Sequence, residues 1–186
     1  MMTKRPALLN LALAASTLAL ALGGCSGGVP AKAEPTDPAG NFHVVSESLS
    51  RGGRPDEAGV TRLHEMGVRL IVDLEDDMDA VATERGWATA LGIEHRSAPM
   101  NGETTPADDM VNDLLATFAD PSQGPFFVHC QEGVDRTGVV VGLYRVFDEG
   151  WTAADAYTEM KALGFKTYLS KLRDYYSTKT GYAAQE

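Results

Sequence analysis

The sequence is poor in positive charge and in histidine. Its 186 residues include 16 lysines and arginines against 26 aspartates and glutamates, a net charge of −10. Because polyanions are bound by basic patches, this balance excludes nucleic acid as an expected partner. Four histidines occur, and His43, His64 and His95 are isolated, without the spacing of metal ligands. We therefore expect neither a metal nor any other cofactor.

Long apolar runs are also rare, and the clearest one lies at the N-terminus. Residues 1–6 carry two positive charges, and residues 7–22 are almost wholly apolar. This run is shorter than the roughly 20 residues of a membrane-spanning helix, and small residues follow it. Such a segment is typical of a secretory signal, with a retained membrane anchor as the alternative.

Cysteine occurs twice, first at the end of this segment. Leu22-Gly23-Gly24-Cys25 is similar to the lipobox of bacterial lipoproteins. The resemblance implies that residues 1–24 are a signal peptide and that acyl chains on Cys25 tether the protein to a membrane. Serine at position 26 favours the outer membrane, by resemblance to enterobacterial sorting. We therefore expect an exported protein that is lipid-anchored to a bacterial cell membrane and faces the periplasm.

The second cysteine, Cys130, has no partner under this interpretation. A lipidated Cys25 cannot form a disulfide, so Cys130 stays a free thiol in an oxidising compartment, where structural cysteines usually pair. Residues 25–41 are rich in glycine, proline and alanine, which predicts a flexible tether. The folded domain is expected over residues 42–186.

Within that domain, short apolar runs alternate with helical patterns. Asp56 and Thr152 are predicted helix N-caps, and Thr105 with Pro106 is predicted to open a helix. The alternation predicts an α/β domain with a mainly parallel central sheet covered by helices on both faces. Extended segments are expected over 42–51, 68–74, 93–97 and 125–129, and helices over 57–66, 80–91, 105–118, 137–147, 152–163 and 167–178.

The stretch HCQEGVDRTG places Cys130 directly after an expected strand and before an expected helix. A loop at a helix N-terminus directs several backbone N–H groups into one concavity, which favours an anion. Gly133 permits the positive φ of such a loop, and Arg136 offers a planar fork for two phosphate oxygens. The same positive surroundings favour a thiolate at Cys130. These residues, numbered 130–136 and called the Cys130 loop below, predict a site for attack on phosphorus.

The pattern resembles the His-Cys-x5-Arg-Ser/Thr signature of cysteine-dependent protein tyrosine and dual-specificity phosphatases, and the likeness covers about residues 42–165. It implies a dual-specificity-phosphatase-like fold in which Cys130 forms a phosphocysteine intermediate and His129 orients the loop. It further implies that Arg136 binds phosphate and that the Thr137 hydroxyl bonds the sulfur. The residues expected to surround the substrate are Gln131, Glu132, Gly133, Val134, Asp135 and Arg136.

The general acid is open. In most of the family an aspartate on a separate loop protonates the leaving oxygen, but Asn101 stands near that position here. Aspartate directly before the loop arginine is similar to the myotubularin pattern, so Asp135 is the favoured proton donor and Glu103 the second. Asp108 and Asp109 are expected in the first turn of a helix, where they favour its dipole.

The substrate is open too. Acidic residues within the Cys130 loop repel heavily phosphorylated ligands, which favours phosphotyrosine proteins. The alternatives are an inositol polyphosphate phosphatase of the phytase kind, a catalytically inactive phosphate-binding module and, third, a rhodanese-type sulfurtransferase. A set of basic residues could form a rim around the site, and a set of acidic residues after the second strand is expected in a solvated loop rather than a cation site. The basic set is Arg51, Arg54, Arg96, Lys161 and Lys166, and the acidic set is Asp73, Glu75, Asp76, Asp77 and Asp79.

Overall fold

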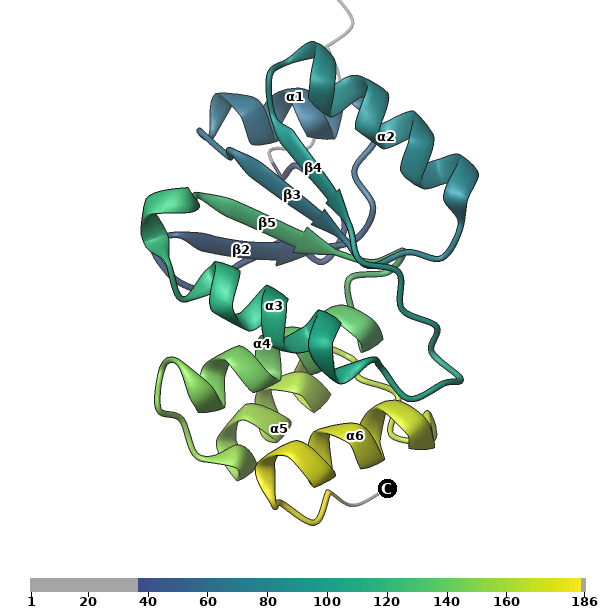
Figure 1. Ribbon diagram of the computed structural model, residues 1–186, viewed down its shortest axis with the longest axis vertical. Helices are drawn as coiled ribbons and strands as arrows, with labels where there is room; N and C mark the ends of the chain where they lie inside the picture. Colours follow the sequence, from purple (N-terminus) through teal and green to yellow (C-terminus); the bar gives the residue numbers. More distant parts are fainter. Residues whose placement is uncertain (1–36, 185–186) are drawn as a thin grey trace, which may run out of the picture. The chain divides into compact units, whose positions relative to one another are not determined.

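Two largely apolar, fully buried strands, β3 (Leu70–Asp73) and β5 (Phe126–His129), lie within a five-stranded sheet, and helices cover both its faces (Figure 1). The computed structural model describes residues 37–184, so the expected signal peptide, Cys25 and most of the expected tether lie outside the described residues. Among residues 37–184, no helix is long and apolar enough to cross a membrane. The strands are β1 His43–Val44, β2 Leu49–Gly52, β3 Leu70–Asp73, β4 Glu94–Ser97 and β5 Phe126–His129. The helices are α1 Glu57–Glu65, α2 Met78–Ala90, α3 Asp108–Phe118, α4 Asp135–Phe147, α5 Ala153–Ala162 and α6 Ser170–Thr180, with a 3-10 turn, η1, at Pro121–Gln123.

The sheet is mainly parallel, as predicted, with the strand order β1-β2-β5-β3-β4. Only β1 runs antiparallel to its neighbour in this sheet, because it joins β2 through a short turn. In the register of the parallel strands, Gly52, His129 and Asp73 are direct neighbours across β2, β5 and β3. The carboxyl ends of these three strands therefore meet at one edge, where ligands of open α/β sheets bind.

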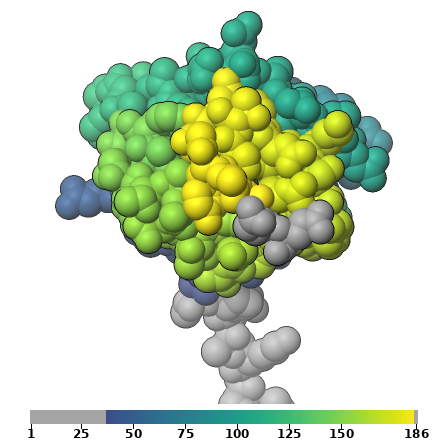
Figure 2. Space-filling view, turned by 90° about the horizontal axis from the view of Figure 1, so that it is seen from below, coloured from purple at the N-terminus to yellow at the C-terminus, as the bar shows by residue number. Residues whose placement is uncertain are grey.

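The two faces of the sheet are covered differently. In Figure 1, α1 and α2 lie on one side of the sheet and α3 to α6 on the other. Phe126 and Val128 belong to the larger apolar cluster, whereas Phe127 between them belongs to the cluster on the α1 side. This alternation follows from the two-residue period of a strand. Figure 2, seen from below, shows the C-terminal residues beside those around α3, where Lys179 pairs with Asp108 at 2.7 Å.

Some helix boundaries differ from the sequence prediction. The prediction that Thr105 and Pro106 open α3 is wrong: the helix begins at Asp108, after an N-cap at Ala107 that makes no side-chain bond. Acidic residues in the first turn and the ion pair to Lys179 support the later start. Asp77 caps α2 through the Ala80 N–H and starts it two residues early.

The acidic segment after β3 is only partly solvated. Asp73 and Glu75 are 1% and 2% exposed, which contradicts the expectation of a solvated loop for them. The Asp73 carboxylate accepts the Glu75 N–H at 2.8 Å, and Glu75 forms a bidentate pair with Arg54. Arg54, distant in sequence, therefore holds the Glu75 carboxylate inside the fold, and His129 Nε2 lies 3.8 Å from Asp73 Oδ1. Asp76, Asp77 and Asp79 are exposed.

Candidate active site

The Cys130 loop leaves the end of β5 and enters α4, which begins at Asp135, two residues earlier than predicted. Gly133 has a φ of +72°, the left-handed region that favours glycine. A Cβ at this position would lie 2.2 Å from the carbonyl carbon of Gly52 and 2.4 Å from the N of Gly53. Glycine is therefore required both by the backbone conformation and by the close packing of the loop on the turn after β2.

Three donors behind the loop hold three consecutive carbonyl groups. In a trans peptide the C=O and the following N–H point in opposite directions. The N–H groups of residues 132–134 are thus turned away from these donors, as an anion-binding loop requires. The backbone N–H of Arg54 donates to the Gln131 carbonyl at 3.2 Å. The side chains of Asn41 (Nδ2) and Arg51 (Nη2) donate to the carbonyls of Glu132 and Gly133, each at 2.8 Å.

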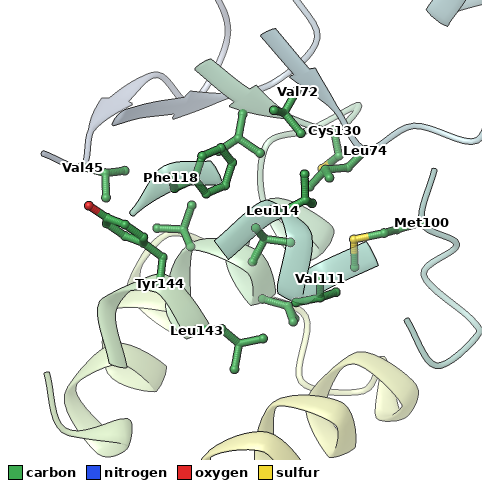
Figure 3. Close-up of a cluster of buried hydrophobic side chains, with 14 of the residues drawn as sticks. Val45, Val72, Leu74, Met100, Val111, Leu114, Phe118, Cys130, Leu143 and Tyr144 are labelled. Carbon is green, nitrogen blue, oxygen red and sulfur yellow. The ribbon is translucent and has the colours of Figure 1, made fainter. Parts of the chain in front are cut away.

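Cys130 lies at the base of this loop as a free thiol that is 2% exposed. Burial alone would raise its pKa, but Thr137, through its hydroxyl and its N–H, the charge of Arg136 and the Gly133 N–H together hold the pKa of Cys130 below its usual value. Among the described residues no other group pairs with the buried Thr137 hydroxyl. In Figure 3 the thiol lies beside Leu74 at one edge of the apolar cluster. The sequence prediction of a thiolate therefore has a structural basis.

Arg136 reaches from the first turn of α4 to the loops that follow β3 and β4. Its Nη1 donates to Asp76 Oδ1 at 3.0 Å and to the Met100 carbonyl at 3.1 Å. Within residues 37–184 its Nε and Nη2 have no hydrogen-bond partner. The Arg136 side chain is 14% exposed and lines the pocket, so these two donors remain available to a ligand.

A pocket of about 390 Å³ opens over the thiol. It brings together five of the predicted substrate-binding or catalytic residues with Glu103. Gly133 and Val134 do not line the pocket, and Thr137 is buried, with its hydroxyl and N–H bonded to the Cys130 sulfur. The remaining lining residues are Asp76, Asn101, Gly102, Lys166 and Leu169, of which the sequence suggested only Lys166 for a rim around the site. The full lining is Asp76, Asn101, Gly102, Glu103, Cys130, Gln131, Glu132, Asp135, Arg136, Lys166 and Leu169.

Asp135 is held by the segment between α5 and α6. Its Oδ1 accepts the Lys166 N–H at 2.8 Å, and its Oδ2 lies 3.3 Å from the Lys166 ammonium, which also pairs with Glu132 at 2.6 Å. Both carboxylate oxygens of Asp135 are therefore in contact with Lys166 at the wall of the pocket. The assignment of Asp135 as general acid stays a prediction, as does the second candidate, Glu103.

Of the five basic residues considered for a rim, Lys166 alone lines the pocket. The others serve the fold, which leaves the walls of the pocket largely acidic or neutral. Arg51 is buried behind the loop, Arg54 pairs with Glu75, Arg96 bonds Asp113 and Thr117, and Lys161 lies over the ring of Tyr157.

Behind His129 lies a buried polar cluster that the sequence did not indicate. Glu84 Oε1 lies 2.9 Å from His129 Nε2 and 3.3 Å from His95 Nε2. His95, isolated in sequence, lies on β4, and Glu84 of α2 contacts both His95 and His129. Burial lowers the pKa of His129, but the carboxylates of Glu84, Asp73 and Glu75, with Glu84 acting most strongly, together raise it above its usual value. Burial conversely raises the pKa of Glu84, but both imidazoles hold it below its usual value.

The cluster is also the place where described residues could share a cation. Asp73, Glu84 and His95 form one compact group of ligand atoms, and Asp73, Glu75 and His129 form another. Two of these carboxylates already have partners other than a cation: Glu84 contacts both imidazoles, and Glu75 pairs with Arg54. The expectation of no metal stays a prediction.

Stability should depend on pH through this cluster. Because the folded-state pKa of His129 is raised, its contribution is complete below the ordinary value of 6.5 and is lost as pH rises through the folded-state value. Because the pKa of Glu84 is lowered, its contribution is present above the ordinary 4.5 and is lost as pH falls through the folded-state value. We expect Tm to fall above pH 6.5 in the wild type and to fall less in Glu84→Gln. Asp79→Asn, exposed on the same helix, is the control, and parallel curves for Glu84→Gln and wild type would contradict the expectation.

Replacement of Gly133 by alanine should distort the Cys130 loop. We expect Gly133→Ala to lose more than about 2 kcal/mol of unfolding free energy, since the left-handed conformation alone costs about 1–2 kcal/mol. Gly150 has the same φ of +72° but open space around it, so Gly150→Ala isolates the conformational cost. Urea unfolding measures both variants. Equal losses would show that the contact with Gly52 and Gly53 is unimportant.

Known proteins resemble this chain in sequence and in fold. A family model described as DSP-PTPase phosphatase fused to NAD+ kinase matches residues 39–174. The dual specificity protein phosphatase TpbA of Pseudomonas aeruginosa is 30% identical over 136 residues, which cover 73% of this chain and 60% of that protein. An inositol diphosphatase, DSP5 of Arabidopsis thaliana, is 28% identical over 143 residues, covering 73% and 68%.

Solved structures agree on the fold. The crystal structure of P. aeruginosa TpbA superimposes with a TM-score of 0.65 at 27% identity and covers 80% of this chain and 91% of that one. The catalytic core of the PP-IP phosphatase SIW14 from S. cerevisiae gives 0.66 at 20% identity, covering 76% and 86%, and supports the fold alone. Since the family match spans most of the described residues and includes the strand, the Cys130 loop and the helix that carry the site, the chain belongs to the DSP-PTPase phosphatase family.

Proposed function

We propose that the chain is a phosphomonoesterase that works through a phosphocysteine intermediate, as a protein tyrosine or dual-specificity phosphatase. One observation carries the proposal: an ionisable thiol lies at the base of an open pocket, beneath backbone N–H groups and beside Arg136. Such a site both supplies a nucleophile and stabilises the charge that develops on phosphoryl oxygens. The fold family supports the same activity.

Two displacements complete the reaction. The Cys130 thiolate attacks phosphorus, the bond from phosphorus to the ester oxygen breaks, and a general acid gives that oxygen its proton. A water molecule then attacks the phosphocysteine, losing a proton to the conjugate base, and the thiolate leaves. Arg136 and the loop N–H groups hold the phosphoryl oxygens in both steps, while Thr137 stabilises the departing sulfur.

The identity of the general acid can be tested through the leaving group. An aryl phosphate with an acidic leaving group needs little protonation, whereas an alkyl phosphate needs a full proton. If Glu103 is the acid, Glu103→Gln loses far more activity on the alkyl ester than on the aryl ester. Asp135→Asn is the matched variant at the second acidic candidate that lines the pocket, and the same selective loss there would assign the role to Asp135.

The substrate proposed is a phosphotyrosine protein, with an inositol phosphate as the alternative. Glu132 and Asp135 line the pocket, and Lys166 offsets their charge only in part, which disfavours a heavily phosphorylated ligand. Relatives named for both substrate classes keep the alternative in place.

Phosphate release from phosphotyrosine peptides and from inositol phosphates, with Cys130→Ser as the blank, tests the proposal. Faster release from the peptides supports a tyrosine or dual-specificity enzyme, and faster release from inositol phosphates supports the alternative. No release from either class, with phosphate still bound, would favour an inactive binding module.

We further propose that the protein is exported and anchored through a lipid on Cys25. The basic and apolar segments followed by Leu-Gly-Gly-Cys support this arrangement, with the outer membrane as the favoured site. Mass spectrometry of the protein from its native host should find an N-terminus at Cys25 carrying acyl chains, and membrane association should be lost in Cys25→Ser. A mature N-terminus elsewhere would refute the anchor and leave the phosphatase proposal untouched.

A further inference from the structure

Arg51 is a charged side chain with an unusual position. It lies on β2, is 1% exposed and extends behind the Cys130 loop. Its Nη2 donates to the Gly133 carbonyl at 2.8 Å and reaches the Val134 carbonyl at 3.5 Å. Its Nε and Nη1 are buried and have no partner among the described residues. Arg51 is thus bonded to neutral acceptors alone.

The charges that face Arg51 leave its own charge poorly balanced. They are Glu159 of α5, Arg145 of α4 and the Cys130 thiol. Glu159 is already engaged by Arg145 in a bidentate pair, at 3.1 and 2.8 Å. Burial lowers the pKa of Arg51 to about 10, with Glu159 and Cys130 acting in the opposite direction, so the guanidinium stays charged at neutral pH.

An incompletely paired buried charge destabilises a fold, and an apolar side chain of similar length would avoid that cost. Arg51 lies on the far side of the loop from the pocket, so it cannot touch a substrate. The remaining negative groups that its charge can stabilise are the Cys130 thiolate and the phosphoryl group bound to it. Destabilising groups of this kind are typical of functional sites.

Resting on the proposed phosphatase function, we propose that Arg51 is a positioning residue that fixes the rear carbonyls of the Cys130 loop and stabilises the Cys130 thiolate from behind. Holding the carbonyls of residues 133 and 134 turns the N–H groups of residues 134 and 135 the other way. Its positive charge acts on the sulfur from the buried side of the loop, without contact with the ligand, whereas Arg136 lines the pocket. Arg51 and Arg136 therefore act on one sulfur from two sides.

The test compares charge and shape at position 51 in the full-length protein. Arg51→Met removes charge and donors, Arg51→Gln keeps a donor without charge, and Arg51→Lys keeps the charge. Thiolate ionisation is followed by ultraviolet absorbance against pH, with Cys130→Ser subtracted. We expect roughly tenfold less thiolate below the midpoint in the Met and Gln variants and near-wild-type ionisation in the Lys variant. The rate kcat/KM for p-nitrophenyl phosphate at acidic pH should fall by the same factor.

Arg69→Met is the matched control, because Arg69 also donates to backbone carbonyls, those of Ser122 and Gly124, but at the opposite end of the sheet. It should leave thiol ionisation unchanged. If Arg51→Met does not fold, Arg51→Gln decides the outcome. A folded Met or Gln variant whose thiol titrates as in the wild type would overturn the proposal. Because ionisation is read without turnover, an inactive wild type would refute the proposed function and leave this measurement valid.

Discussion

Cys130→Ser should release phosphate about 10⁴-fold more slowly than the wild type, with its fold intact. A serine hydroxyl is not ionised at neutral pH, and the N–H groups and Arg136 that stabilise a thiolate cannot make it an effective nucleophile. Measuring phosphate release from an aryl phosphate, together with binding of inorganic phosphate, checks the expectation. Affinity for phosphate should persist, because the donors of the loop remain.

The substitution also tests the blander interpretation of Cys130 as a packing residue. The thiol is buried beside Leu74, so serine should lower Tm by a small amount under either interpretation. If Cys130→Ser lost stability but kept its turnover, the thiol would be a packing residue of the apolar core and not the nucleophile. Trapping a phosphorylated cysteine by rapid acid quench of the wild type gives direct evidence for the covalent step.

Arg136→Ala should reduce kcat/KM by about 10³-fold, since removal of one preorganised charged donor commonly costs 10²–10³-fold. Two of its donors are available to the ligand, while Nη1 also ties the loop after β3 to the loop after β4 through Asp76 and Met100. Truncation to alanine removes both the ligand donors and the contacts that join the two loops. Arg136→Lys keeps the charge but not the planar fork, so a loss of about 10²-fold is expected there.

The comparison for Arg136 is Arg96→Ala. Arg96 also forms an ion pair, with Asp113 at 3.3 Å, but it does not line the pocket. Its kcat/KM should stay within about twofold of the wild type, as for surface ion pairs in general. Wild-type activity in Arg136→Lys would mean that a positive charge is sufficient at this position and that the planar fork of arginine is not needed.

The family and the α/β fold could be predicted from the sequence because their signals are local. A strand, a loop and a helix follow one another in the sequence around Cys130, and the apolar residues of α4 form a nearly continuous run in the sequence. The match to the DSP-PTPase family and the parallel sheet confirm those predictions. Burial of Asp73 and Glu75 could not be predicted, because Arg54 and His129 approach them only in the folded chain.

The pocket wall shows the same limit. Lys166 comes from the segment between two C-terminal helices, and only the tertiary fold brings its ammonium to Asp135 and Glu132. The order of the helices along the sequence does not show that the Lys166 ammonium lies near the carboxylates of Asp135 and Glu132. A proton-donor assignment made from loop position alone therefore could not foresee that Asp135 would be held by two donors from one lysine.

The contact between Asn41 and the Glu132 carbonyl has a practical consequence. Asn41 precedes β1, has a φ of +51°, and its neighbour Gly40 accepts the Gly53 N–H at 2.7 Å. A shortened protein that begins at Phe42 would keep every residue of the pocket wall and still lose two supports behind the loop. Truncated versions used in activity assays should therefore retain residues 37–41. Without these residues, a loss of activity would reflect a distorted Cys130 loop rather than the properties of the intact site.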